Sequence, residues 1–508
     1  MASASDIANR VPITIALMLA TVMNSLDTTI ANVALPHIQG SVSASQDQIA
    51  WVLTSYLIAT AIMTPLSGWL SVRFGRKQLF ALSIAGFTIA SMLCGIATSL
   101  GEIVAFRLLQ GICGASLIPL SQAVILDLYP PSKLGQVMAV WGAGAILGPI
   151  FGPALGGWLT DNLSWRWVFY INLPIGALAL SGVLLFMSSG GGAKAKPFDF
   201  LGFGALSVFV GAFQLCVDRG PNLDWFSSPE IWTEAVIGAT AFYIFLVQTL
   251  TARHPFFDRA LATDRNFVSC TVFGFFIGIL LFSTMALLPV MMQQFMGYSA
   301  LESGIVSMPR GIGSFAAMFV VGRLIGRVDT RLILMTGLSL SAFSLWQMTR
   351  FDLSMTAGPI VVSGIIQGAG IGLIFVPLST LAFTTLPPTL RAEATGVYTL
   401  MRSLGASVGI SLMEALWTSN TSVAHSTLAA HVIPSDVAVK AALGASLGAG
   451  GSGGLEALNG EITRQAAMVA YLDDFKLMMF ITLACMPLLL LMRTPKLAPE
   501  EGVHVVVD

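Results

Sequence analysis

The stretch GAGAILGPIFGPALGG, residues 142–157, combines regularly spaced glycines with two prolines inside an apolar run. On a helix, glycines four residues apart form a groove almost free of side chains, and a second helix can pack closely against it. Close packing needs only the glycines, whereas a proline removes a backbone hydrogen bond and bends the helix. We therefore predict a bending membrane helix that seals against a neighbour. Its key residues are Gly144, Gly148, Pro149, Gly152, Pro153, Gly156 and Gly157.

The composition of the chain indicates a membrane protein. Of its 508 residues, 55% are hydrophobic and only 10% are charged, against about 25% charged in an ordinary soluble domain. The mean hydropathy is +0.81. A bilayer core about 30 Å thick needs about 20 apolar residues per helix. We predict an all-α integral membrane protein with fourteen such segments, near 12–34, 49–71, 78–98, 102–128, 135–158, 166–187, 198–217, 231–250, 267–295, 300–322, 332–349, 357–384, 395–418 and 474–493.

Basic residues are distributed unequally between the two sides of this bundle. An even number of spans puts both termini on one side, and the short loops of the other side hold only Arg166, Arg219 and Arg350. The positive-inside rule then predicts cytoplasmic termini and no cleaved signal peptide. Sixteen Lys and Arg residues fall on the side of the termini: Arg10, Arg73, Arg76, Lys77, Lys133, Lys194, Lys196, Arg253, Arg259, Arg265, Arg323, Arg327, Arg331, Arg391, Arg493 and Lys496.

The two halves of the chain repeat one pattern at an offset near 257 residues. LLQGICGASLIPLS (108–121) matches IIQGAGIGLIFVPLS (365–379), and Pro130-Pro131 matches Pro387-Pro388. Gly405 and Gly409 match two glycines of the opening stretch. Parallel repeats of this kind organise transporters that rock around a central site.

Six helices need about 200 residues, so the larger offset leaves room for two additional spans. We predict two pseudo-symmetric six-helix bundles, residues 1–187 and 265–508, joined by a linker with two spans, residues 188–264. The second bundle contains a long outer loop, 419–473, around the Gly/Ser-rich stretch 442–454. The segments on either side of this stretch are either short helices or irregular chain. The loop as a whole is either functional or a tolerated insertion.

Asp27 and Arg107 are charged residues deep inside predicted spans. Asp27 lies roughly 22 Å from the inner end of its helix, and Arg107 about 9 Å from the outer end of a helix running the other way. In a core about 30 Å thick these depths coincide, so we expect an ion pair that lowers the cost of burying both charges. Pairing alone is one interpretation. The other is a proton switch, because burial favours a neutral carboxyl group and a nearby guanidinium favours a charged one.

Three motifs resemble those of the major facilitator superfamily. GPIFGPALGG (148–157) resembles its fifth-helix antiporter motif, GWLSVRFGRK (68–77) its loop 2–3 signature, and FRLLQG (106–111) its fourth-helix signature. In the loop motif, Val72 stands where the superfamily has an acidic residue that locks the state closed to the cytoplasm. The remaining motif residues are interpreted as orientation and hinge residues: Gly68, Arg73, Gly75, Arg76 and Lys77.

Two further stretches resemble one branch of the superfamily, the fourteen-helix drug:proton antiporters of the EmrB/QacA group. They are LDTTIANVALP (26–36) and WRWVFYINLPIG (165–176), and the similarity extends over most of the chain, closest to the EmrB members. The resemblance implies the major facilitator fold, with Asp27 as the proton-carrying acid and Arg107 as its partner. Asp127, at the inner end of a span, is either a proton relay or an ordinary interfacial residue.

Polar and bulky residues within the spans are the candidates for a substrate cavity, although each is equally open to a packing role. Arg310, near mid-depth, could meet an acidic substrate or a helix carbonyl, and Glu414 could serve an exit path or contact water. The candidates are Asn24, Gln110, Trp141, Arg310, Gln367, Arg402, Met413 and Glu414.

The resemblance implies proton-driven export of hydrophobic or amphipathic compounds from a bacterial inner membrane. It also implies an EmrA-like periplasmic membrane-fusion adaptor and a TolC-like outer-membrane channel as partners, besides membrane lipid. An uptake symporter and a non-transporting receptor or scaffold are the alternatives. We expect no enzyme, because no nucleophile–base set, metal cluster or phosphate loop is seen. We likewise expect no cofactor, metal or nucleic-acid partner.

Overall fold

The computed structural model of the chain describes residues 4–49, 51–189, 197–387, 389–432 and 453–492. Several residues used in the sequence analysis lie outside these ranges. They are Lys194, Lys196, Pro388, residues 442–452 of the Gly/Ser-rich stretch, Arg493 and Lys496.

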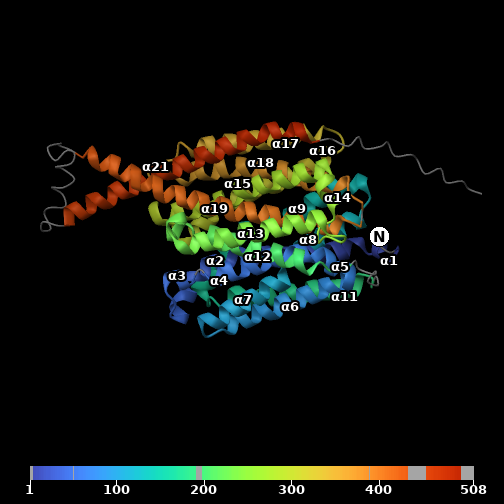
Figure 1. Ribbon diagram of the computed structural model, residues 1–508. Coiled ribbons are helices and arrows are strands. Elements are labelled where there is room, and N and C mark those ends of the chain that lie inside the picture. The colour runs from blue at the N-terminus through green and yellow to red at the C-terminus, as the bar shows by residue number, and fades with distance from the viewer. Residues whose placement is uncertain (1–3, 50, 190–196, 388, 433–452, 493–508) are drawn as a thin grey trace, which may run out of the picture.

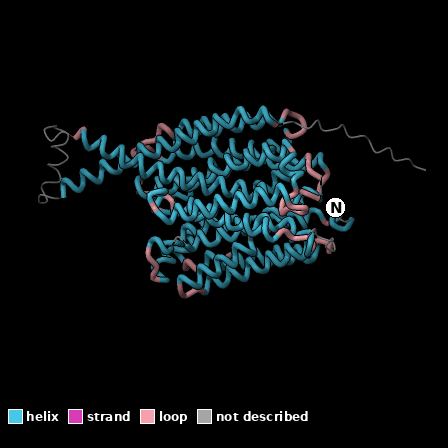
Figure 2. The backbone as a smooth tube through the Cα atoms, viewed as in Figure 1, coloured by secondary structure: helices cyan, strands magenta, loops and turns pink. Residues whose placement is uncertain are grey.

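Long helices lying side by side build the molecule, and short connections join them at the two ends of the bundle (Figure 2). The first half begins with the short α1 (Ala4–Ala8), and α3 (Gln46–Ile49) lies in its first outer connection. Its long helices are α2 (Arg10–Val42), α4 (Trp51–Met63) continued by η1 (Thr64–Leu66) and α5 (Ser67–Phe74), α6 (Arg76–Ile96), α7 (Leu100–Gly114) with α8 (Leu117–Leu128), α9 (Pro131–Asn162), and α10 (Trp167–Tyr170) with α11 (Asn172–Phe186).

The second half follows two additional long helices. These are α12 (Phe200–Arg219) and α13 (Pro229–Thr251), with η2 (Pro221–Leu223) and η3 (Trp225–Ser227) between them and the short α14 (Arg259–Thr263) after them. The remaining helices are α15 (Arg265–Phe295), α16 (Ala300–Leu324), α17 (Thr330–Met348), α18 (Ala357–Thr384), α19 (Arg391–Ala430), and α21 (Gly453–Cys485) followed by η4 (Met486–Leu491).

Each of the fourteen predicted segments coincides with one of these helices or helix pairs. Within the described residues, eleven helical stretches are long and apolar enough to cross a membrane. The other three are α17, α19 and α21, which correspond to the predicted segments 332–349, 395–418 and 474–493.

The stretch 142–157 lies inside α9, and its glycines let α9 pack directly on α2. A Cβ atom at Gly148 would lie 2.4 Å from the backbone carbon of Ser25, and one at Gly152 would lie 2.1 Å from Thr29 Oγ1. Gly144 and Gly156 face the same helix, at Met18 and Ile30. The predicted seal against a neighbouring helix is therefore confirmed, and α2 is that neighbour.

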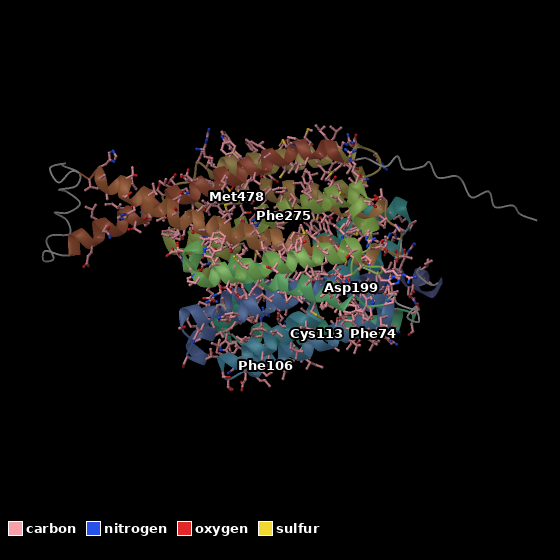
Figure 3. The ribbon with its side chains drawn as sticks, viewed as in Figure 1. Phe74, Phe106, Cys113, Asp199, Phe275 and Met478 are labelled. Carbon is pink, nitrogen blue, oxygen red and sulfur yellow. The ribbon has the colours of Figure 1, made fainter. Side chains whose placement is uncertain are left out.

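The second half repeats this packing, as the internal repeat predicts. Gly405 and Gly409 on α19 face α15, with Gly405 against the backbone of Phe275, which Figure 3 labels, and Gly409 against that of Ile279. Because α9 and α19 match in the repeat, and so do α2 and α15, the same glycine seam occurs once in each half.

Residues 419–430 and 453–473 of the predicted long outer loop are helical, which agrees with the interpretation of its flanks as helices. They continue α19 and α21 beyond the bundle as a projecting pair of helices (Figure 1). His425 Nε2 and Asn459 Oδ1 lie 3.0 Å apart across the pair, and Trp417 Nε1 donates to the carbonyl oxygen of Ala467 over 3.3 Å. We call residues 418–430 and 453–470 the outer hairpin. The two helices of the outer hairpin are polar, and they contact each other.

The outer hairpin marks one end of the bundle, which we call the hairpin end. The opposite end carries the N terminus, α5 and α14 (Figure 1), and we call it the basic end because Arg73, Arg76 and Lys77 lie there.

The two additional helices lie along the seam between the halves. α12 contacts both α4 and α19. Thr54 Oγ1 of α4 donates to Asp218 Oδ2 of α12 over 2.5 Å, and Gln214 Nε2 of α12 donates to Ser407 Oγ of α19 over 2.8 Å. Asp199, labelled in Figure 3, caps α12 by accepting from Gly202 N and also accepts from Gln248 Nε2 of α13. The pair therefore joins the two bundles.

Candidate functional site

Asp27 and Arg107 form the predicted ion pair in the interior of the first bundle. Arg107 Nη1 donates to Asp27 Oδ2 over 2.7 Å. Each side chain is only 1% exposed. Asp27 comes from α2 and Arg107 from α7, one residue after Phe106, which Figure 3 labels.

Two amides complete the hydrogen bonding of the carboxylate. Asp27 Oδ1 accepts from Gln110 Nε2 and from Asn172 Nδ2, each over 2.8 Å. Gln110 Oε1 in turn accepts from Arg107 Nη1 over 2.8 Å, and Asn172 Nδ2 also donates to Ser91 Oγ over 2.9 Å. Three donors stabilise the charged carboxylate, so its burial is compensated by direct contacts.

Arg107 has further partners on α4. Its Nε donates to the carbonyl oxygen of Val52 over 3.1 Å, and its guanidinium lies 4.2 Å from the ring centroid of Tyr56. The hydroxyl of Tyr56 accepts from Asn24 Nδ2 over 3.1 Å. The predicted cavity residues Asn24 and Gln110 thus belong to the polar network around Asp27.

Asp127 lies at the basic end and is separate from the Asp27 network. Its Oδ2 accepts from Arg76 Nη1 over 2.6 Å, and its Oδ1 accepts from Arg391 Nη1 over 2.8 Å. Arg391 starts α19 in the second half, so Asp127 ties the two bundles together by charge. Although Val72 replaces the acidic motif residue, an ionic contact between the bundles persists at this end.

The loop-motif residues surround this junction. A Cβ atom at Gly68 would lie 2.8 Å from the Cα atom of Glu393 on α19, so only glycine allows this approach. Gly75 has φ of 85°, which favours glycine at the turn between α5 and α6. Lys77 Nζ donates to the carbonyl oxygen of Leu184 over 2.8 Å, and Arg73 is exposed.

In the second bundle, Arg310 contacts neutral groups. Its Nη2 donates to Thr284 Oγ1 over 3.1 Å and to the carbonyl oxygen of Leu281 over 3.4 Å. Gln367 Nε2 donates to the same Thr284 hydroxyl over 3.5 Å. Of the two partners considered for Arg310, the structure contains a helix carbonyl, that of Leu281.

Trp141 and Arg402 meet the same aromatic ring. Trp141 of α9 stacks on Phe375 of α18, with ring centroids 6.2 Å apart, and its Nε1 donates to Ser121 Oγ over 3.0 Å. The Arg402 guanidinium lies 5.6 Å from the Phe375 centroid. The stacking of Trp141 on Phe375 joins the two halves of the molecule.

The remaining cavity candidates differ in exposure. Met413 is fully buried, whereas Glu414 is exposed near the hairpin end. Gly157, the last glycine of the opening stretch, has no atom closer than 3.9 Å to the position of a Cβ atom. Of the predicted cavity set, Asn24 and Gln110 surround Asp27, Gln367 and Arg310 meet at Thr284, and Met413 and Glu414 join neither group.

Sequence reasoning did not single out Asn172, Tyr56 or Asp474. Asn172 lies in the quoted stretch 165–176, and its position as a lone amide in an otherwise apolar span was the available signal. Asp474 on α21 is 1% exposed, and neither carboxylate oxygen has a hydrogen-bond partner in the part of the chain that the structure describes. It was missed because position 474 is the predicted edge of a span.

Comparison with known proteins establishes the family. The sequence profile of the Major Facilitator Superfamily matches residues 17–410. The chain is 37% identical over 430 residues to the multidrug export protein EmrB of Haemophilus influenzae, covering 83% of each chain. The chain belongs to the major facilitator superfamily. It is 34% identical over 489 residues to the fatty acid resistance protein FarB of Neisseria gonorrhoeae, covering 95% of this chain and 96% of FarB.

Solved structures of major facilitator proteins share the fold. The human organic anion transporter MFSD10 matches with a TM-score of 0.62 at 15% identity, covering 93% of this chain and 99% of the other. The proton:xylose symporter XylE matches with a TM-score of 0.57 at 15% identity, covering 93% and 95%. The family match and the 37% identity to an export protein make this chain a multi-pass membrane transporter of the major facilitator superfamily, a family of transporters and not of enzymes.

Proposed function

We propose that this transporter is a proton-driven exporter of hydrophobic or amphipathic compounds, a multidrug and fatty-acid efflux protein of the EmrB and FarB type. The observation that carries the proposal is the buried Asp27 carboxylate, held by Arg107, Gln110 and Asn172. The similarity to an export protein and a resistance protein over most of the chain supports it.

The proposed coupling uses the charge of Asp27 as a switch. While Arg107 touches the carboxylate, the pair is neutral as a whole and the proton stays off. When α2 and α7 separate, or a substrate intervenes, the carboxylate remains in an apolar interior without its counter-charge and takes up a proton. Arg107 cannot release a proton at physiological pH, so the proton travels on Asp27.

The proton gradient is the proposed energy source, with no bound cofactor. At a membrane potential of ~150 mV, one proton moving inward releases about 3.5 kcal/mol. This free energy supports a substrate gradient of about 300-fold. One proton per cycle therefore drives substantial accumulation.

The proposed setting is a bacterial inner membrane with the basic end and both termini in the cytoplasm. The bundles 1–187 and 265–508 rock against each other, and the linker 188–264 supplies the helices along their seam. The outer hairpin then projects into the periplasm, where we propose that it contacts an EmrA-like membrane-fusion adaptor joined to a TolC-like outer-membrane channel.

The test places the purified protein in liposomes with an imposed pH gradient and follows the fluorescence of ethidium. Movement of ethidium against the proton flux supports export by antiport. Movement in the direction of the protons would support an uptake symporter instead, and the absence of any movement would support a receptor or scaffold.

A further inference from the structure

The second bundle contains a buried polar cluster whose composition resembles that of the Asp27 site in the first. The repeat offset of 257 residues takes Asp27 to Thr284 and Gln110 to Gln367. The contact is repeated as well: Gln110 Nε2 donates to Asp27 Oδ1 over 2.8 Å, and Gln367 Nε2 donates to Thr284 Oγ1 over 3.5 Å. The two contacts are similar in chemistry, although the glycine seams place Ser25 opposite Gly148 and Phe275 opposite Gly405, so α15 is shifted along its axis relative to α2.

The arginine of the second cluster comes from a different helix. The position that corresponds to Arg107 is Gly364, and a Cβ atom there would lie 3.6 Å from the Cβ atom of Arg310 on α16. Arg310 crosses this glycine and donates to Thr284 Oγ1 over 3.1 Å. The second bundle thus keeps an amide and a guanidinium beside position 284, but it has a hydroxyl group where the first bundle has a carboxylate.

No carboxylate balances Arg310 in the described part of the chain. α15 and α18 contain no Asp or Glu, and the single acidic residue of α16, Glu302, caps the start of its own helix. Arg310 is 9% exposed, and among its guanidinium nitrogens only Nη2 donates to described residues. A buried guanidinium with neutral partners is unfavourable until an anion joins it.

The chemistry of the cluster selects the anion. A guanidinium binds planar acid groups with two parallel hydrogen bonds, which a carboxylate matches in shape and in charge. A small cavity beside Gln367 is lined mainly by apolar side chains, among them Leu281 and Ile371, together with the hydroxyl groups of Ser341 and Thr482. An acid group attached to an apolar body fits these surroundings better than a hydrophilic acid does.

We propose that Arg310, Thr284 and Gln367 form a binding site for the carboxylate of an amphipathic acid, a long-chain carboxylic acid above all. The substrate carboxylate contacts Arg310 in the second bundle as the Asp27 carboxylate contacts Arg107 in the first. This inference rests on the proposed export function, because it locates the head-group site of one substrate class, and it gives the two sites different roles. The first site carries the proton, and the second holds the acid head group.

The hydrogen bond between Arg310 and Thr284 suggests a direct test, the variant Thr284→Asp, which places a carboxylate beside the guanidinium. The new side chain would pair with Arg310 as Asp27 pairs with Arg107, so it would occupy the site from within the protein while neutralising the buried charge. Arg310→Gln removes the cation instead. Arg350→Gln is the matched control, because Arg350 is exposed near the hairpin end and lies 3.9 Å from the ring centroid of Trp346.

The experiment measures equilibrium binding of radiolabelled laurate to the full-length protein in phosphatidylcholine nanodiscs. Dodecyltrimethylammonium, which has the same chain length and a cationic head, is the comparison ligand. We expect Thr284→Asp and Arg310→Gln each to weaken laurate binding by about tenfold or more, which corresponds to the loss of a charge-assisted contact. Binding of dodecyltrimethylammonium should change by less than about twofold, and Arg350→Gln should bind both ligands as the parent does.

Unchanged laurate binding in Thr284→Asp would overturn the proposal, and so would an equal loss of both ligands. A third arm adds anionic phosphatidylglycerol to the discs. If this lipid abolishes laurate binding to the parent protein, the occupant is a lipid phosphate and the assignment of a carboxylic acid substrate is wrong. Because binding needs no pH gradient, failure of export in liposomes would leave a positive binding result intact, and the two proposals can fail separately.

Discussion

At the scale of single residues, the Asp27 carboxylate depends on neighbours from three other helices. Arg107 and Gln110 come from α7 and Asn172 starts α11, while Ser91 on α6 accepts a second hydrogen bond from the same Asn172 nitrogen. The buried charge is therefore compensated only when α2, α6, α7 and α11 are in place together. The network stabilises the packing of the first bundle as well as the charge.

We predict that Asn172→Leu lowers the free energy of unfolding by about 1–3 kcal/mol, because Asp27 Oδ1 and Ser91 Oγ each lose a buried donor. Thermal unfolding of the purified protein in nanodiscs measures the change. Asn162→Leu is the control, since the exposed Asn162 side chain donates only to the carbonyl oxygen of Trp158 in its own helix. Equal stability of the two variants would contradict the proposed role of the amide.

The ion pair could be predicted from sequence, whereas most of its partners could not. Asp27 and Arg107 stood out because a buried charge is costly and their depths coincide. Asn172 carries no charge, so its local sequence marks it only as a lone amide in an apolar span and does not identify a carboxylate as its partner. The contact of Asp127 with Arg391 joins residues in different halves, so local sequence does not reveal it. Thr284 could be recognised as a partner of Arg310 only from the structure.

At the scale of helices, the glycine seam between α9 and α2 determines how closely the two helices approach. A Cβ atom at Gly148 would meet the backbone of Ser25 at 2.4 Å, whereas one at Gly157 would find its nearest atom at 3.9 Å. The Ser25 backbone cannot rotate away from a Cβ atom at position 148, whereas a flexible side chain could. The two glycines therefore differ in tolerance although they lie in one motif.

We expect Gly148→Ala to reduce ethidium efflux from proteoliposomes by about tenfold or more, because α2 must move away and Asp27 moves with it. Gly157→Ala should retain the parental rate. Comparable activity of the two variants would show that the seam does not position the site.

The outer hairpin shows why polar helices escape a hydropathy-based analysis. Residues 418–430 are rich in Ser, Thr and Ala, and their sequence reads equally well as a loop. Their helical structure is supported by contacts with the other arm of the hairpin, including the one between His425 Nε2 and Asn459 Oδ1. Such contacts join segments separated by the Gly/Ser-rich stretch, so local sequence does not reveal them. The apolar parts of the same helices were predicted because a bilayer imposes their length.

At the scale of the whole molecule, the two bundles meet at the basic end through charge and through close backbone contact. Asp127 bridges Arg76 and Arg391. Gly68 and Gly396 allow α19 to lie directly against the chain around α5. The two bundles are therefore in direct contact at this end.

We predict that Asp127→Asn favours opening of the basic end, because the carboxamide cannot balance two arginines. A cysteine at Ser67, which is 2% exposed at this junction, reports the opening in a background without the native cysteines. Its labelling by a water-soluble maleimide should accelerate about fivefold or more, the effect of roughly 1 kcal/mol on a two-state equilibrium. Asp161→Asn, an exposed site at the far end of α9, is the control, and equal labelling rates in both would argue against an ionic junction.

Uphill transport by the Asp27→Asn protein tests the coupling of the whole molecule most directly. Purified parent and variant are placed in liposomes, and ethidium accumulation is followed under an imposed pH gradient and again under an ethidium gradient alone. We predict that the variant loses accumulation driven by the pH gradient, because its side chain can no longer exchange a proton, while it still allows downhill movement. Accumulation at the parental level by Asp27→Asn would contradict the account.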